Sequence, residues 1–511
     1  MYTLADLPRK GADHHASRTA VVFEDTRLTY DELNRRVNRA AHALANLGLR
    51  RGERLTILSD NSARYLETYL AAAKLGLSVT PLNTRLSAAE LKYIADDSEA
   101  VAIVAGDGYE ARAAALLSSV PALRFGVSLD NAAEGFAGYE EALSQAPDHE
   151  PDRAREPSED ELAVLMYTGG TTGAPKGVML SHRNVMTAAV ADAIEMEYTK
   201  DDATCFVLPI FHVSWWPILS LLLVGGKVVI SRVPDLNQIL RLIQDEKCTH
   251  MNAVPTIYGW LIEMAPVDSY DLSTLRLLTY AGSPIAVQVL KRAMTVFGPI
   301  FAQGYGATET AGGPITIFEA EDHHLEGEDS RLLASAGKAS ICSEVKIVDD
   351  DDQTVEPGVI GEVYVRGKHI MMGYWKNPEL TAKALKGGWY HTGDMGYLDE
   401  RGYLFLTDRK SDMIISGGEN VYPNEVENAV YTHPAVLECS VVGAPDERWG
   451  EIVHAVVVHR AGVVIAPEEI IEHCRQTLAG YKCPKRVTFL DSLPKTAVGK
   501  VSRKNVKELV R

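Results

Sequence analysis

The amino-acid sequence predicts an α/β protein, with a large multilayer α/β N-terminal domain and a small α+β C-terminal domain. Segments typical of strands alternate with segments typical of helices through the first half, as layers built on parallel sheets require. After Asp408 this alternation gives way to a turn-rich stretch and a shorter mixed pattern. A length of 511 residues is long for one domain and comfortable for two or three.

Helix and strand signals follow one another at short intervals in the first half. Strands are expected at 54–59, 79–82 and 101–105, with helical spacing of apolar residues over 64–76. Capped helix starts are predicted at three places: Thr29 with Glu32, Ser87 with Glu90, and Asn377 before Pro378.

The C-terminal part of the chain is predicted to form a small unit of about 100 residues, enough for a modest core of its own. Its expected elements are helices near 424–431 and 468–478, and strands at 437–442, 453–459 and 486–490. We therefore divide the chain into a large domain (1–408), a hinge (409–412) and a small domain (413–511).

The composition excludes several classes of partner. Lys and Arg number 51 against 69 Asp and Glu, which gives a net charge of −18. Such a chain is a poor general binder of nucleic acid, because its long-range field repels phosphate. Six Cys form no CxxC pair, so neither a zinc site nor a disulfide framework is indicated. A reducing, cytoplasmic setting is expected.

The N-terminal residues contain no apolar region of the secretory type, and one internal segment resembles a membrane span. Residues 203–226 carry no formal charge over 24 positions. Pro209 and Pro217 interrupt this segment, and Gly225-Gly226 end it. We therefore expect a buried strand–turn–helix rather than a span.

The strongest chemical motif is the sequence YTGGTTGAPKG at 167–177. Glycines let backbone N–H groups wrap an anion, and threonine hydroxyls add donors. It is not a Walker A loop, because Pro175 replaces the glycine before Lys176. A flexible linker is the alternative, and the three threonines and the Pro-Lys-Gly ending argue against it.

Further stretches carry groups that suit nucleotide chemistry. In QGYGATET (303–310), Tyr305 can stack on a purine, Thr308 can donate to a phosphate, and Glu309 can hold a hard cation. Two later stretches, WYHTGDMG (389–396) with Asp394 and PKTAVGK (494–500) with Lys500, add a candidate carboxylate and a candidate cation.

Taken in order, these motifs resemble the adenylate-forming superfamily, which includes acyl-CoA synthetases, luciferases and the adenylation domains of peptide synthetases. AGSP at 281–284 and Arg409 in DRKSD (408–412) fit the same pattern, and the resemblance extends from about Thr29 to Lys504. Within the superfamily, the chain resembles the benzoate-type and fatty-acid CoA ligases.

The resemblance implies roles for individual residues. Lys500, His212 and Glu309 would be catalytic, with Thr172 and Glu309 at Mg²⁺. The ATP or AMP would contact Thr168, Gly169, Gly170, Thr171, Thr172, Gly173, Lys176, Gly282, Ser283, Gly304, Tyr305, Gly306, Thr308, Asp394 and Arg409.

Coenzyme A is the thiol that the resemblance implies, reached when the small domain rotates about Ser411. The family usually has Asp or Lys at this hinge position. The CoA contacts would be Arg85, Gly417, Gly418, Trp449, Tyr481 and Lys485. Another basic position of that set is Cys483 here, so one contact is missing.

The acyl pocket implied by the resemblance lies beside His212, and the Trp pair at 215–216 would shorten or flatten it. Its lining would be His212, Val213, Trp216, Ala281, Gly282, Gly304, Gly312 and Gly313. Gly304 stands where dicarboxylate members carry an arginine, which favours an acid with an uncharged tail. Both an aromatic acid and a short-to-medium aliphatic acid fit, and a homodimer is one assembly that we consider.

Two functions of different classes follow. The first is an AMP-forming acid:CoA ligase, and the second is a ligase that loads the phosphopantetheine arm of a carrier protein. A catalytically silent nucleotide-binding regulator is disfavoured, because Lys500, Glu309, Asp394 and the glycine-rich loop are all present. Luciferase activity is disfavoured more weakly.

Overall fold

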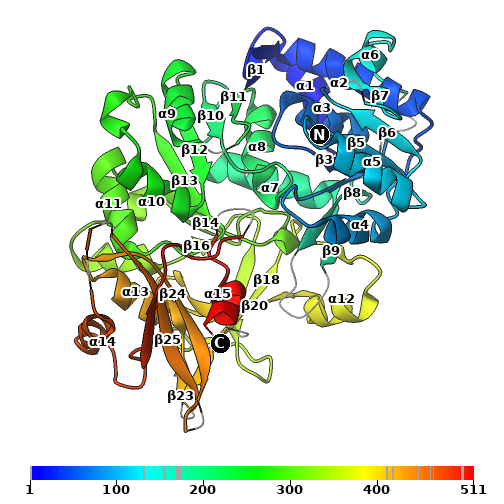
Figure 1. Cartoon of the computed structure of the whole chain (residues 1–511). Helices are drawn as coiled ribbons and strands as arrows, with labels where there is room; N and C mark the ends of the chain where they lie inside the picture. Colours follow the sequence, from blue (N-terminus) through cyan, green and yellow to red (C-terminus); the bar gives the residue numbers. More distant parts are fainter. Residues whose placement is uncertain are drawn as a thin grey trace.

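The computed structural model describes residues 3–130, 133–152, 157–168, 175–233, 235–409, 412–416, 419–446, 448–460, 462–463, 465–496 and 500–510. A large α/β domain reaches Arg409, and a small α+β domain follows from residue 412. In Figure 1 the small domain, in orange and red, lies below the green half of the large domain. The predicted fold class is confirmed.

One sheet of the large domain is parallel at its centre and antiparallel at its edges. Its strands β14, β13, β12, β10, β11 and β1 pair in parallel. The strand order across the sheet is β16 (Lys338–Ala339), β15 (Thr316–Phe318), β14 (Phe301–Tyr305), β13 (Leu277–Ala281), β12 (His250–Ala253), β10 (Ala203–Phe206), β11 (Lys227–Ile230), β1 (Thr19–Phe23) and β2 (Thr26–Thr29).

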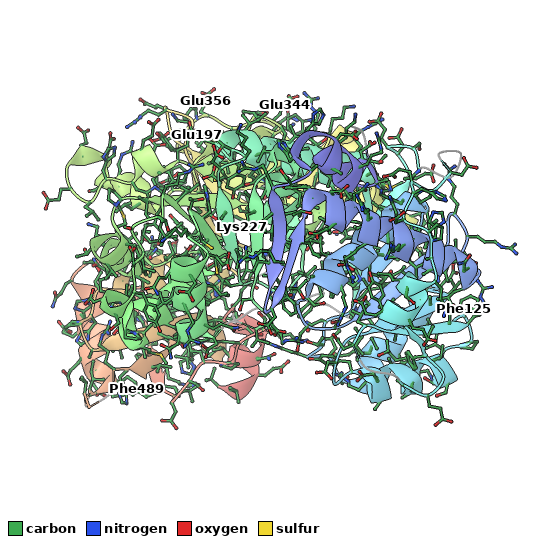
Figure 2. The ribbon with its side chains drawn as sticks, turned by 90° about the horizontal axis from the view of Figure 1, so that it is seen from above. Phe125, Glu197, Lys227, Glu344, Glu356 and Phe489 are labelled. Carbon is green, nitrogen blue, oxygen red and sulfur yellow. The ribbon has the colours of Figure 1, made fainter. Side chains whose placement is uncertain are left out.

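A second sheet stands beside the first, and Figure 2 shows the two halves of the domain from above, with Phe125 in one half and Lys227 towards their junction. It contains the strands predicted at 54–59, 79–82 and 101–105. Its order is β19 (Gly373–Tyr374), β9 (Lys176–Ser181), β8 (Leu162–Thr168), β4 (Ser78–Pro81), β3 (Arg54–Leu58), β5 (Ala102–Ala105), β6 (Phe125–Ser128) and β7 (Ala137–Gly138).

Helices cover both sheets, and the predicted capping boxes of Thr29 and Ser87 are both formed. The α-helices of the large domain are α1 (Asp6–His15), α2 (Tyr30–Asn46), α3 (Ala63–Lys74), α4 (Ala88–Asp97), α5 (Glu110–Ser119), α6 (Tyr139–Ser144), α7 (His182–Glu195), α8 (Trp216–Val224), α9 (Leu236–Asp245), α10 (Pro255–Met264), α11 (Val287–Phe297) and α12 (Pro378–Ala384). Short 3₁₀ helices are η2 (Val213–Trp215), η3 (Val267–Ser269), η4 (Thr308–Thr310), η5 (Ala320–Asp322), η6 (Glu328–Ala334) and η7 (Lys386–Gly388).

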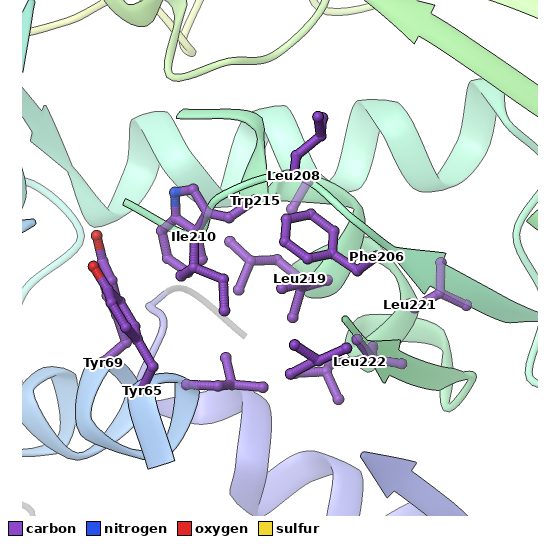
Figure 3. Packing of buried hydrophobic residues seen from close by; sticks show 14 of the residues in the cluster. Tyr65, Tyr69, Phe206, Leu208, Ile210, Trp215, Leu219, Leu221 and Leu222 are labelled. Carbon is purple, nitrogen blue, oxygen red and sulfur yellow. The ribbon is translucent and has the colours of Figure 1, made fainter. Parts of the chain in front are cut away.

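The uncharged segment 203–226 forms β10, η2 and α8, as predicted. Gly225 ends α8 with a left-handed backbone (φ 86°), which a residue with a side chain adopts at a cost. Figure 3 shows how this segment packs, with Phe206 of β10 among Trp215, Leu219 and Leu222. No helix in the described ranges is long and apolar enough to cross a membrane.

The last part of the large domain is an antiparallel sheet that leads into the small domain. Its order is β17 (Glu344–Val348), β18 (Gly361–Arg366), β20 (Tyr390–Leu398) and β21 (Leu404–Arg409). The elements of the small domain are β22 (Ile414–Ser416), β23 (Glu419–Val421), α13 (Pro423–Tyr431), β24 (Val436–Asp446), β25 (Gly450–His459), α14 (Pro467–Arg475), β26 (Arg486–Phe489) and α15 (Arg503–Leu509).

The small domain has an apolar core separate from that of the large domain. Ile414, Val426, Val441, Val457 and Ile470 belong to one buried cluster, built only from residues after 413. The main cluster of the large domain ends at Phe405. Each domain thus buries its own apolar surface, and the contacts described below between the domains are polar.

Asp192 is an ionisable group that lies fully buried in α7. Its side chain is 0% exposed, and neither carboxyl oxygen has a hydrogen-bond partner among the described residues. The neighbouring hydroxyl of Ser220 donates instead to the carbonyls of Ala189 and Trp216. Burial raises the pKa of Asp192 well above its usual range, so the folded protein keeps this carboxyl protonated to a higher pH than the unfolded chain does.

We expect Asp192→Asn to remove a pH dependence of stability. Above pH about 4 the unfolded chain releases the proton that the folded chain keeps. The free energy of unfolding of the wild type should therefore fall by about 1.4 kcal/mol per pH unit on account of this group. Urea unfolding at pH 4 to 8 measures the slope for each protein. Equal slopes for the two proteins would contradict a neutral Asp192.

Candidate active site

The glycine-rich loop connects two antiparallel strands, β8 and β9. Thr168 at the end of β8 pairs with Lys176 at the start of β9. The hydroxyl of Thr168 is buried and has no hydrogen-bond partner in the described part of the chain. The predicted phosphate contacts Gly169, Gly170, Thr171, Thr172 and Gly173 lie outside the described residues.

Lys176 is linked to Glu309 by two hydrogen bonds through the hydroxyl of Tyr374. Its ammonium lies 4.5 Å from the ring centre of Tyr374 and donates to the phenol oxygen at 3.3 Å. The Tyr374 hydroxyl then donates to Oε1 of Glu309 at 2.8 Å. Burial, with the nearby Glu309 carboxylate, raises the pKa of Tyr374, so it remains a donor. Sequence reasoning missed Tyr374, because β19 is far along the chain from both partners.

Asp394 is held between Tyr305 and Arg409. The Tyr305 hydroxyl donates to Oδ2 at 2.5 Å, and Nε of Arg409 lies 3.1 Å from Oδ1. Asp394 of β20 and Arg409 of β21 are cross-strand partners, which explains the second contact. Burial raises the pKa of Asp394, and the Arg409 guanidinium opposes that rise. The sequence-predicted ribose contacts therefore lie together.

The carboxyl ends of β13 and β14 form the floor of the site. Ala281 and Gly304 are partners in adjacent strands, followed by Gly282 and then Ser283. Gly282 has a left-handed backbone (φ 85°). A Cβ at Gly306 would lie 2.5 Å from the Gly313 carbonyl oxygen, so the loop before Thr308 closes tightly only with glycine there.

Lys500 crosses from the small domain to this floor. A Cβ at Gly282 would lie 2.7 Å from both Cε and Nζ of Lys500, so the ammonium lies directly against that glycine. No carboxylate in the described ranges forms an ion pair with it. Burial lowers the pKa of Lys500 to about 8, and the positive charge of Arg409 adds to the shift. A half-buried cation without an anionic partner among the described residues is suited to receive an anionic ligand.

His212 lies near Lys500 at the start of the predicted acyl pocket. Its Nε2 is buried and has no hydrogen-bond partner in the part of the chain described. Burial lowers the pKa of His212 to about 3, and the charges of Lys500 and Arg85 contribute. The imidazole is therefore neutral at ordinary pH and can donate or accept a hydrogen bond without carrying charge.

The predicted pocket residues differ in how much space they leave. A Cβ at Gly304 would meet nothing within 4 Å, so open space lies over this residue. A Cβ at Gly312 would lie 2.4 Å from the Val213 carbonyl oxygen and 2.7 Å from Cδ1 of Trp216. Likewise, a Cβ at Gly313 would lie 2.6 Å from Cβ of Ala188. Gly312 and Gly313 thus allow close packing rather than leaving room.

The two adjacent tryptophans point to different neighbours. The Trp215 ring lies 4.5 Å from that of Tyr69 in α3, and Figure 3 shows the two side by side. Trp216 instead reaches Gly312. Of the pair, Trp216 is the one placed at the predicted pocket.

The predicted CoA residues are not brought together at Lys500. Trp449 and Tyr481 are 41% and 40% exposed on the small domain, and Lys485 donates to the Gly480 carbonyl at 3.2 Å. Trp449 directly precedes Gly450, which pairs with Ser416 of β22. The strand next to β22, β23, lies at the bottom of Figure 1, away from the large domain. Only Arg85, exposed after β4, is near the site. Ser411, Gly417 and Gly418 lie outside the described residues.

Polar contacts that the sequence did not predict hold the two domains in this arrangement. The Arg460 guanidinium lies 2.7 Å from Glu263 of α10, and Lys495 lies 4.7 Å from the ring centre of Trp260. Beside the hinge, Nη1 of Arg503 is 2.5 Å from Oδ1 of Asp408. These contacts favour the conformation in which Lys500 is in the site.

The fold and the site define an adenylate-forming enzyme. Comparison with known families agrees, because the AMP-binding enzyme family matches residues 8–375 and the AMP-binding enzyme C-terminal domain matches residues 425–500. The chain belongs to the AMP-binding enzyme family. Within it, the protein is an acid–thiol ligase of the AMP-forming type.

Three similar proteins illustrate the range of the family. Feruloyl-CoA synthase from Amycolatopsis sp is 38% identical over 510 residues, covering 99% of this chain and 98% of that protein. Fatty acid–[acyl-carrier-protein] ligase ScoC from Streptomyces coeruleorubidus is 35% identical over 520 residues, covering 99% and 96%. The anthranilate CoA ligase AuaEII, crystallised with anthranoyl-AMP, has a TM-score of 0.92 at 26% identity, covering 100% of this chain and 97% of that chain.

Proposed function

We propose that this protein is an acid:CoA ligase for aromatic carboxylic acids. In the first half-reaction, a carboxylate oxygen attacks the α-phosphorus of ATP and pyrophosphate leaves, giving an acyl-adenylate. In the second, the CoA thiol loses its proton and attacks the acyl carbon, and AMP leaves. The observation that carries the proposal is the ammonium of Lys500, which lies at Gly282 near both Arg409 and His212 and has no ion-pair partner in the described ranges.

Each half of the site has a distinct task in this proposal. Asp394 accepts the ribose hydroxyls, and Tyr305 packs against the adenine. The Lys500 ammonium stabilises the charge that develops as the carboxylate approaches the α-phosphate. Neutral His212 borders the carboxylate without adding charge. The loop between Thr168 and Lys176 takes the outer phosphates through backbone N–H groups and hydroxyls.

Mg²⁺ completes the proposed cofactor set. Among the described residues no group of three or more His, Cys, Asp or Glu side chains forms a cage for a metal. A single carboxylate such as Glu309, together with ATP phosphates, is nevertheless the donor set that Mg²⁺ usually takes. Glu309 has one oxygen engaged by Tyr374, which fixes the carboxylate. Thr172 is the second proposed ligand. The bound ion would neutralise phosphate charge.

We expect Glu309→Gln to raise the Mg²⁺ concentration needed for half-maximal adenylation by roughly tenfold, because a neutral amide binds the ion more weakly. Titration of pyrophosphate release with MgCl₂ measures the change. Tyr374→Phe is the matched control, since it removes the hydrogen bonds of this hydroxyl to Glu309 and from Lys176 but leaves the Glu309 carboxylate in place. An unchanged titration for Glu309→Gln would remove Glu309 from the metal site.

The preference for an aromatic acid rests on the pocket and on two relatives. Trp216 lies against Gly312 and offers a flat apolar surface, and the space over Gly304 is open. In our proposal these two features form opposite sides of the acyl pocket. Feruloyl-CoA synthase and the anthranilate CoA ligase are named for aromatic acids.

CoA would reach the site after the small domain rotates about Ser411, which would bring Trp449, Tyr481 and Lys485 towards Arg85. We also propose a cytoplasmic location and a homodimeric assembly.

Pyrophosphate release with ATP and Mg²⁺ across a panel of acids tests the function. The panel runs from acetate to dodecanoate and includes benzoates, phenylacetate and cinnamates, each with and without CoA. Release with aromatic acids, increased by CoA and accompanied by acyl-CoA on chromatography, is the expected result. Release with an acid but no acyl-CoA would favour loading of a carrier protein, as in the ScoC relative. No release with any acid would overturn the proposal.

A further inference from the structure

One face of the central sheet carries a polar pair, Asn252 and Thr279. The register of β12, β13 and β14 places Asn252 beside Thr279 and Thr279 beside Ala302. Side chains alternate between the two faces of a strand, so Ala281 and Gly304, two residues further on, lie on this same face. Asn252 and Thr279 therefore line the sheet one step deeper than the open space over Gly304.

Helix α8 packs mainly on the neighbouring strands β10 and β11. Phe206 is the partner of Asn252 in β10, and Figure 3 shows Phe206 packed towards Trp215 and Leu219. Trp216, which closes against Gly312, begins the same helix. The polar pair thus lies in the layer between sheet and helix that contains the proposed acyl pocket.

Only the nitrogen of the Asn252 side-chain amide makes a hydrogen bond with a described residue. Its Nδ2 donates to Oγ1 of Thr279 at 2.7 Å, while Oδ1 is buried and has no partner among the described residues. The side chain is 2% exposed, so bulk water does not reach it. A buried polar atom without a partner is destabilising, and the strand neighbour Phe206 offers no polar group to pair with it.

The spacing along the strand fits a small aromatic acid. Lys500 marks the carboxylate end at Gly282, and Thr279 is three residues earlier in β13. Three residues of strand span about 10 Å. An acid whose carboxylate is at Lys500 would place a group on the far side of its ring near Asn252.

We infer that Asn252, oriented by Thr279, accepts a hydrogen bond from a hydroxyl or amino group on the distal side of the acid's aromatic ring. The substrate class is then a hydroxylated or aminated aromatic acid rather than an unsubstituted one. The inference rests on the proposed function, since it concerns the acid that the same site would activate. Asn252 is a specificity-determining residue, remote from the reacting atoms.

Matched pairs of acids test this inference in the intact enzyme. We expect kcat/KM for 4-hydroxycinnamate to exceed that for cinnamate by at least about tenfold, and likewise for 4-aminocinnamate over cinnamate, since a site built around a hydrogen bond rejects an analogue that lacks it. The 4-methoxy acids, which accept but cannot donate, should behave like the unsubstituted acids. If the methoxy and hydroxy acids are equally good, the donor requirement is wrong.

Asn252→Leu should abolish this preference, so that kcat/KM for 4-hydroxycinnamate falls to about that for cinnamate. The leucine removes a buried unpaired polar atom, so the variant should fold, and its melting temperature checks this. Thr279→Val should weaken the preference, because the Asn252 amide loses the hydrogen bond that orients it. Thr204→Val is the matched control, as its buried hydroxyl also lacks a partner in the described structure but sits in β10 beside His250.

The outcomes separate this inference from the function on which it rests. Acyl-CoA formation from aromatic acids with no preference between matched pairs would overturn the inference alone. The same holds if Asn252→Leu keeps the wild-type preference, or if Thr204→Val loses it. Absence of adenylation with every acid would instead overturn the proposed function.

Discussion

Replacing Lys500 by alanine should reduce adenylation by at least about 10²–10³-fold, the usual cost of losing a preorganised charge in the transition state. Its ammonium is the unpaired cation that lies against Gly282, where we place the α-phosphate and the carboxylate. Thiolysis of a supplied acyl-adenylate should be retained, because that step develops no charge between two anions. Pyrophosphate exchange measures the first step, and acyl-CoA formation from acyl-adenylate measures the second.

The pH profile adds a second readout for the same lysine. Its pKa is lowered to about 8 in the free enzyme, so the ammonium is present below that pH and is lost above it. Adenylation should therefore decline as the pH rises through about 8. Lys500→Arg keeps its charge at all these pH values and should shift the decline upward. Adenylation unimpaired in Lys500→Ala would reject the assignment.

Asp394→Ala should raise the KM for ATP by roughly 10–100-fold, because hydrogen bonds to a charged group contribute about 1.5–3 kcal/mol. The carboxylate is held ready by Tyr305 at 2.5 Å and Arg409 at 3.1 Å. Calorimetric titration with a non-hydrolysable ATP analogue measures the affinity directly. Tyr305→Phe, which keeps the ring and removes one hydrogen bond, should have the smaller effect. Unchanged affinity in Asp394→Ala would reject the ribose role.

The elements that the sequence predicted are those with local causes. The capping boxes at Thr29 and Ser87 need only neighbours three residues away, and both are present. Segment 203–226 was predicted from its prolines and terminal glycines, and it forms β10, η2 and α8. The small domain also has its elements close to the predicted positions, as with α13 at Pro423–Tyr431.

The residues that the sequence did not reveal act across long separations. Tyr374 links Lys176 to Glu309 only because β19 pairs with β9. Asn252 was not singled out in the sequence, and its proposed role comes from strand register and from an oxygen without a partner among the described residues. Arg460 meets Glu263 across a domain boundary. None of these relations has a period or a spacing in the sequence that could predict it.

The separate apolar cores have a consequence for how this protein melts. The buried cluster of the small domain shares no residue with that of the large domain. The links described between them are polar: Arg460 with Glu263 and Lys495 with Trp260 are partly exposed, and Arg503 with Asp408 lies beside the hinge. Exposed contacts such as the first two contribute little cooperativity. Heating should therefore give two calorimetric transitions, and a ligand that bridges Lys500 and Gly282 should draw them together into one.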